Sequence, residues 1–169
     1  MKVIVTLTPS ELEKAAYGGV QRRIRALQRQ RTPNQQERPE WEQKWWQSDI
    51  IGAIGEMAVS KAFGVDWHDL EDDVNGKDVL DYQVRTIENP SAGLRVRSHD
   101  STDDIFILTE VRKNKALLHG YSTGAIVRAH AWEEFPRCFT LPKEQLYHVT
   151  DLAHPIEWSD HVQAQRPMM

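Results

Sequence analysis

The sequence predicts an α+β domain in which helices flank a mixed or antiparallel sheet. Two segments among the first 64 residues have helical character, and residues 79–121 read as successive strands. A further short helix is expected at residues 124–134. Helices followed by a run of strands and another helix are typical of a single α+β core. The 169 residues are enough to bury such a core as one domain.

The first segments are a short strand at residues 2–7 and a helix at residues 8–30. Thr8 is the expected N-cap, Pro9 the first helical residue, and Glu11 the residue that closes a capping box. The apolar stripe of this helix consists of Leu12, Ala16, Val20, Ile24 and Leu27. Residues 31–40 are polar, contain two prolines and show no periodicity, so we expect a mobile loop.

The second helix is predicted to be capped by Ser48 or Asp49 and to end at Gly64. An acidic loop follows at residues 65–77. Predicted strands cover residues 79–87, 94–98, 105–111 and 116–121, and an edge strand is expected at 147–150. The predicted core spans about residues 48–130, and residues 131–169 form a C-terminal extension.

The cysteine content and the lengths of the apolar runs exclude several classes of protein. Cys138 is the only cysteine, which excludes an internal disulfide and a cysteine-rich zinc site and suggests a reducing cytoplasm. No apolar run approaches the ~20 residues of a membrane span, and the first residues do not resemble a secretory signal. We therefore expect no membrane association.

Charge is unevenly distributed although the net charge is only −4. Arg22, Arg25 and Arg29 are spaced by three and four residues, which places them along one helical face. A basic face of this kind beside an acidic segment suits a protein that gathers phosphates and a cation together. Acidic residues instead gather after Asp66. The alternative is a solvated helix face beside an acidic loop.

Glu56 is the first candidate site residue. Gly52 and Gly55 lie beside it in mid-helix, where each glycine costs roughly 1 kcal/mol relative to alanine. The small residues suggest that a strand or a phosphate backbone approaches this face while Glu56 reaches a cation. Alternatively, the glycines allow tight packing of helix on sheet, and Glu56 is a buried acid with satisfied hydrogen bonds.

The segment from Asp78 to Thr86 supplies the other candidates. Strand alternation places Asp81, Gln83 and Arg85 on one face. Mg2+ or Mn2+ favours hard oxygen ligands, so Asp78 is the first choice of ligand, with Asp81 or Asp73 as alternates. Gln83 offers a neutral oxygen, and Arg85 offers a charge that can hold a phosphate. The alternative is a solvent-facing edge strand with an Arg–Asp pair.

Two weaker patterns complete the candidates. Trp41, Trp45 and Trp46 can stack on unpaired bases, although at helical spacing they more often cover a hydrophobic core. The acidic residues near His99 can bind a cation, but turn-forming aspartate is the usual explanation. They are Asp100, Asp103 and Asp104.

The chain resembles a group of small bacteriophage proteins over about residues 7–156. The resemblance rests on the following segments: LTPSELEKAAYGGVQRRI, a Trp before GAIGEMAVSKAFG, DVLDYQVRT, LRVRSHDSTDDIFILTEV and HGYSTGAIVRA. The arrangement also resembles the PD-(D/E)XK nuclease superfamily, in which a helical acid, an Asp and a Glu-x-Lys triplet bind magnesium and cut phosphodiesters. That resemblance implies a restriction-endonuclease-like fold.

Residue by residue, the resemblance assigns the helical acid to Glu56 and the motif Asp to Asp78. Gln83 stands where Glu is usual, and Arg85 where Lys is usual. Arginine stays protonated and cannot act as a base, although it can stabilise charge on a phosphate. The resemblance therefore implies a metal-dependent DNA endonuclease, slow or degenerate, acting in the host cell cytoplasm. We then expect Arg22, Arg25 and Arg29 to contact the DNA backbone. The alternative is a non-catalytic phage protein that binds DNA or a host protein.

Overall fold

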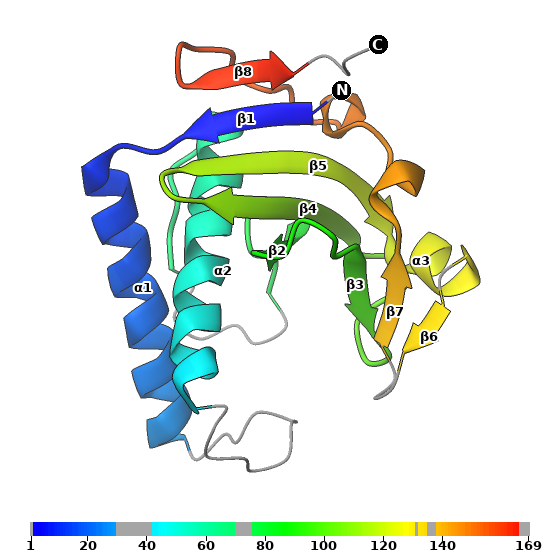
Figure 1. The fold of residues 1–169 in the computed structure, drawn as a ribbon, viewed down its shortest axis with the longest axis horizontal. Helices are drawn as coiled ribbons and strands as arrows, with labels where there is room; N and C mark the ends of the chain where they lie inside the picture. Colours follow the sequence, from blue (N-terminus) through cyan, green and yellow to red (C-terminus); the bar gives the residue numbers. More distant parts are fainter. Residues whose placement is uncertain (1, 30–41, 70–75, 131, 135–137, 166–169) are drawn as a thin grey trace.

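Figure 1 shows the computed structural model of the chain, which describes residues 2–29, 42–69, 76–130, 132–134 and 138–165. The predicted loop at residues 31–40, Trp41 and the alternate ligand Asp73 lie outside these ranges. The architecture is α+β, as predicted, and the described residues form a mixed five-stranded sheet, a second three-stranded sheet and three α-helices.

The first two elements match the sequence prediction. Strand β1 spans Lys2–Thr6, and helix α1 spans Pro9–Gln28. The Glu11 N–H donates to Thr8 Oγ1 at 3.2 Å, and the Thr8 N–H donates to Glu11 Oε2 at 2.7 Å. These two hydrogen bonds confirm the predicted capping box. It could be predicted from the sequence because both bonds join residues that are three positions apart.

Helix α2 spans Glu42–Ala62 and packs beside α1 (Figure 1). It begins earlier than predicted, so the assignment of Ser48 or Asp49 as its cap is wrong. Asp49 lies within the helix and forms an ion pair with Arg23 of α1, with 2.6 Å between Arg23 Nη2 and Asp49 Oδ2. This tertiary partner gives the Asp49 carboxylate a role other than capping.

The larger sheet has the strand order β2-β4-β5-β1-β8. Its later strands are β2 (Tyr82–Ile87), β4 (Ile105–Arg112), β5 (Lys115–Thr123) and β8 (Val162–Gln165). Only the β2–β4 pair is parallel, and it leaves β2 at one edge of the sheet. Since β1 and β8 belong to the same sheet, that sheet extends beyond the predicted core of residues 48–130.

The smaller sheet has the order β3-β7-β6. It consists of β3 (Leu94–Arg97), β6 (Trp132–Glu134) and β7 (Cys138–Leu141). Helix α3 spans Gly124–His130, so the predicted extension of this helix to residue 134 is wrong. Residues 132–134 instead pair with β7. Neither β7 nor β8 was expected from the sequence, because each forms by pairing with a strand distant in the chain, β3 and β1 respectively.

The predicted edge strand at residues 147–150 is also wrong. Val149–Asp151 forms a single 3-10 turn. Tyr147 nevertheless makes an isolated bridge to Tyr121 of β5, with backbone hydrogen bonds of 2.9 and 3.0 Å. One residue of the segment therefore pairs with the sheet, but no strand forms.

The five-stranded sheet buries a different cluster on each face. Along β4, Ile107 belongs to the larger cluster, whereas Phe106 and Leu108 belong to the smaller one. Helix α2 supplies much of the larger cluster and covers that face, while β3 and β7 contribute to the smaller cluster. Membership of one cluster or the other therefore shows towards which face of the sheet a side chain of β2 points.

Candidate functional site

Glu56 lies on the side of α2 that meets α1, and only 5% of it is exposed. Arg22 of α1 donates to both of its oxygens, from Nη1 to Oε1 at 2.6 Å and from Nη2 to Oε2 at 2.5 Å. Trp67 Nε1 donates to Oε2 at 3.2 Å. Both oxygens of the buried carboxylate therefore have hydrogen-bond partners, as expected for a polar group removed from water.

Arg22 also connects Glu56 to a second acid. Its Nε donates to Asp69 Oδ1 at 2.5 Å, and Arg25 donates from Nη2 to Asp69 Oδ2 at 2.5 Å. Burial opposes the charge of Arg22, but the hydrogen bonds and charges of Glu56 and Asp69 outweigh burial and raise its pKa. Two of the three arginines predicted to bind DNA thus contact acids of the same chain, whereas Arg29 is exposed at the end of α1.

Asp78 lies just before β2, where its Oδ2 accepts a 2.7 Å hydrogen bond from the Val84 N–H. Its pKa is raised to about 6, first by burial and then by the negative charge of Glu56. The Val84 hydrogen bond and the charges of Arg85 and Arg22 act in the opposite direction. Residues from α1, α2 and β2 therefore interact electrostatically at Asp78, as functional carboxylates often do with their neighbours.

The side chains of Gln83 and Arg85 point to the face of the sheet that α2 does not cover. Tyr82 and Val84 join the larger cluster, on the face that α2 covers, so strand alternation directs Gln83 and Arg85 away from α2. Gln83 Nε2 donates to the Gly76 carbonyl oxygen at 3.0 Å. The structure thus brings Glu56 and Asp78 into interaction but places the Gln83 side chain on the opposite side of β2 from α2.

Arg85 donates from Nη2 to Asp100 Oδ2 at 3.0 Å, and its guanidinium carbon lies 5.0 Å from the centroid of the Phe106 ring. Asp100 Oδ2 also accepts the Arg97 N–H at 2.8 Å. Burial raises the pKa of Asp100, but the charge of Arg85 and these hydrogen bonds outweigh burial, so the pKa is lowered. Asp100 combines the turn-forming role expected from the sequence with an ion pair that sequence reasoning missed.

The alternate ligands have different outcomes. Asp81 is exposed in the turn before β2 rather than on the strand, so its expected place on the Gln83 face is wrong. The turn residue before it, Leu80, has a φ of 53°. Asp73 cannot be assessed because it lies outside the described residues.

The fit of a divalent cation to these residues is incomplete. Glu56 and Asp78 supply the carboxylate oxygens that magnesium favours, but both Glu56 oxygens already accept hydrogen bonds from Arg22. In the part of the chain that the structure describes, no three acidic, histidine or cysteine side chains are arranged to hold a metal ion. A cation at this position therefore requires a rearrangement of the Arg22 pair.

Two of the three tryptophans singled out from the sequence, Trp45 and Trp46, lie among the described residues. The guanidinium carbon of Arg23 lies 5.7 Å from the centroid of the Trp45 ring, and Trp46 is exposed. Trp67 was not singled out from the sequence, yet it touches Glu56, and its ring lies 5.8 Å from the guanidinium of Arg22. A lone tryptophan in an acidic loop gives no periodic signal that would have identified it.

A second buried ionic group lies on β4 and β5. His119 Nε2 donates to Glu110 Oε2 at 2.7 Å, while Lys143 and Arg112 pair with the same carboxylate at 3.1 and 2.5 Å. Burial raises the pKa of Glu110, but the three hydrogen bonds outweigh it and lower the pKa to about 2. The sequence signal for this group was a glutamate within the mostly apolar strand β4.

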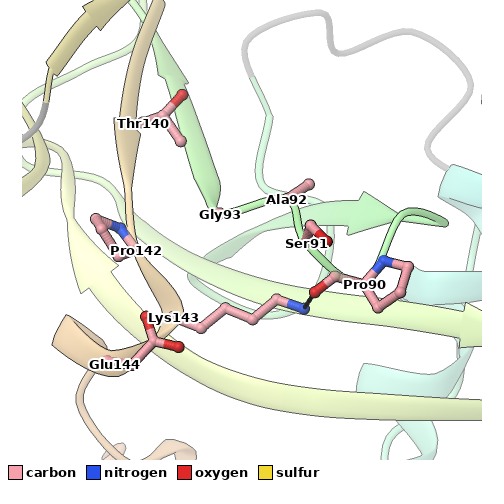
Figure 2. Close-up of a pocket in the computed structure, with 8 residues that line it drawn as sticks. All are labelled: Pro90, Ser91, Ala92, Gly93, Thr140, Pro142, Lys143 and Glu144. Carbon is pink, nitrogen blue, oxygen red and sulfur yellow. Dashed lines mark hydrogen bonds between the residues drawn. The ribbon is translucent and has the colours of Figure 1, made fainter.

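The residues drawn in Figure 2 line a cavity that Lys143 shares with this ionic group. Its volume is about 260 Å³. Lys143 crosses it and donates from Nζ to the Pro90 carbonyl oxygen at 2.7 Å. The walls are formed by the segment before β3 and by the end of β7 with the turn that follows. None of the predicted site residues lines this cavity. Its lining residues are Pro90, Ser91, Ala92, Gly93, Thr140, Pro142, Lys143 and Glu144.

Comparison of the chain with protein-family models, with curated proteins and with solved structures gave no match. Among the described residues, no helix has the length and apolar character needed to cross a membrane. The fold and site define a mixed α+β domain in which the charge of Glu56 on α2 acts on Asp78, just before the edge strand β2.

Proposed function

We propose that this protein is a metal-dependent DNA endonuclease with a restriction-endonuclease-like core, as its resemblance to the PD-(D/E)XK nuclease superfamily implies. The observation that carries the proposal is the convergence of two carboxylates from separate elements. Glu56 comes from a buried helix, Asp78 comes from the turn before an edge strand, and the charge of one acts on the other. Acids brought together in this way are typical of cation sites and hydrolytic centres.

In this proposal Glu56 and Asp78 hold Mg2+ or Mn2+. Gln83 becomes a neutral ligand only when its side chain leaves the Gly76 carbonyl oxygen and turns around the sheet edge that β2 forms. The bound cation supplies an activated water and offsets charge on the phosphate. Arg85 braces the scissile phosphate from the far side of β2, which its electrostatic effect on Asp78 supports. Arg22, Arg25 and Arg29 contribute positive charge along α1, from which DNA approaches.

A second candidate is a non-catalytic protein of the same fold that binds DNA or a host protein. The observation that favours it is that the candidate catalytic side chains already bind other groups of the same chain. Glu56 binds Arg22 at both oxygens, Gln83 binds a backbone carbonyl, and Arg85 binds Asp100. These contacts stabilise the domain without any substrate.

Plasmid and oligonucleotide cleavage with Mg2+ and with Mn2+ distinguishes the two candidates. The nuclease proposal expects wild-type cleavage that Asp78→Asn and Glu56→Gln abolish. It also expects Arg85→Lys to be tolerated and Arg85→Ala to be inactive, because only lysine keeps a charge for the phosphate. Asp160→Asn is the matched control, since Asp160 is exposed in the turn before β8.

Cleavage that persists in Asp78→Asn but disappears in Asp81→Asn would transfer the ligand role to Asp81. If wild type with either metal cleaves no better than Asp78→Asn, while labelled DNA or a host protein is still retained, the binding function replaces the nuclease.

A further inference from the structure

Arg22 occupies the place that a cation would need at Glu56. Its two terminal nitrogens bind the two carboxylate oxygens, and its Nε binds Asp69. The Arg22 side chain is 27% exposed, whereas that of Glu56 is only 6% exposed. The pair therefore joins a partly accessible cation to a buried anion.

The geometry of the Arg22–Glu56 pair makes Arg22 a competitor of a divalent cation. A two-point arginine–carboxylate contact directs both nitrogens at both oxygens, and it is among the stronger ion pairs in proteins. A divalent cation requires at least one of the same oxygens. A cation that binds Glu56 must therefore compete with the guanidinium for a carboxylate whose charge is already balanced.

We infer that Arg22 is a built-in counter-cation that holds the Glu56–Asp78 site in a resting state and competes with the divalent cation for Glu56. The inference rests on the proposed function and adds an autoinhibitory contact to it. Helix α1 delivers the arginine, and Asp69 anchors its Nε. Metal affinity is then set by release of Arg22 as well as by the number of carboxylates.

Arg25 provides a matched control within the same helix. It pairs with the same Asp69, so Arg25→Gln removes a positive charge from the same neighbourhood and leaves the Arg22–Glu56 pair in place. A general change in local charge should appear in both single variants. A specific competition should appear in Arg22→Gln alone.

The experiment measures Mn2+ binding by titration calorimetry and by the thermal midpoint as a function of Mn2+ concentration, on the full chain. Arg22→Gln should bind Mn2+ at least roughly tenfold more tightly than wild type and gain more in midpoint, since binding stabilises only the folded state. Arg25→Gln should stay close to wild type. The double variant Arg22→Gln with Glu56→Gln should lose the gain, because the competed carboxylate is absent.

Loss of Arg22 leaves a buried charge unpaired, so Arg22→Gln can fail to fold without metal. Arg22→Lys covers that case, because lysine retains the charge without the two-point geometry, and its Mn2+ affinity should lie between those of wild type and Arg22→Gln. Equal Mn2+ affinity in wild type, Arg22→Lys and any folded Arg22→Gln would overturn the inference. Tighter metal binding without any cleavage would support the inference and reject the nuclease, whereas wild-type cleavage with unchanged metal affinity in the variants would do the reverse.

Discussion

Thr109 Oγ1 of β4 donates a 3.0 Å hydrogen bond to Thr86 Oγ1 of β2, and both hydroxyls lie beneath Gly55 of α2. A Cβ at Gly55 would clash with these two oxygens. The next residue of α2 is Glu56. The close approach of helix and sheet at Gly55 therefore helps to fix where the Glu56 carboxylate lies.

The two helical glycines should respond oppositely to alanine. Gly55→Ala should destabilise the fold by about 1–3 kcal/mol, because the added methyl forces helix and sheet apart. Gly52 has no atom within 4 Å of a built Cβ, so Gly52→Ala should stabilise by up to about 1 kcal/mol through helix propensity. Urea unfolding of both variants tests this contrast, and two changes of the same sign would refute it.

Asp78→Asn should raise stability at neutral pH. The folded pKa of Asp78, about 6, lies above its ordinary value of 3.8, so ionisation of Asp78 costs stability as pH rises through that interval. Asparagine avoids this cost and still accepts the Val84 N–H. The gain over wild type should be largest at pH 8 and fade towards pH 4 in denaturant titrations at several pH values. A gain that does not depend on pH would place its origin elsewhere.

Lowering the pH should reduce the contribution of the Glu110 ionic group to the stability of the fold. Its folded pKa of about 2 lies below the ordinary 4.5, so the stability it contributes is present above pH 4.5 and is lost as pH falls from 4.5 to 2. Burial also lowers the pKa of His119 despite its bond to Glu110, which adds a loss below pH 6.5. Glu110→Gln should cost about 2–3 kcal/mol at pH 7, since bonds to a charged group are lost. The difference from wild type should shrink in acid, and a constant difference would contradict this assignment.

Gln83→Glu should increase metal affinity at some expense of stability. The new carboxylate adds a charged ligand, but it replaces the amide that donates to the Gly76 carbonyl oxygen. We expect a loss of about 1–3 kcal/mol without metal, from two acceptors facing each other. Mn2+ should support binding and cleavage better than Mg2+, because it is less strict in geometry. Calorimetry of wild type and variant with both metals decides the point, and unchanged affinity would remove Gln83 from the ligand set.

DNA binding, if it uses α1, should depend on salt through Arg25 and Arg29. Each phosphate contact steepens the dependence of log affinity on log salt by roughly 0.9. The double variant Arg25→Gln with Arg29→Gln should flatten that slope and leave the Arg22–Glu56 pair intact. Arg95→Gln, an exposed substitution on β3, is the control. An unchanged slope would assign these arginines to contacts within the chain or to a protein partner.

The sequence by itself determined the elements whose interactions are local. The capping box of α1 joins Thr8 to Glu11, and its start was predicted to within one residue. Strands β3, β4 and β5 were also predicted closely, because alternating apolar residues and turn residues lie within each segment. Glu56 and Asp78 were named as a pair, and the fold lets the charge of one act on the other.

Only the tertiary structure decided which partners these residues have. Arg22 and Glu56 come from different helices, and no local pattern predicts that one binds the other at both oxygens. Strand β8 exists because β1 offers it an edge, although its own VQAQ sequence lacks a strong strand signal. The face that Gln83 addresses depends on which side of β2 receives α2. Such contacts form between residues distant in the chain, so their energies appear only when the whole core is assembled.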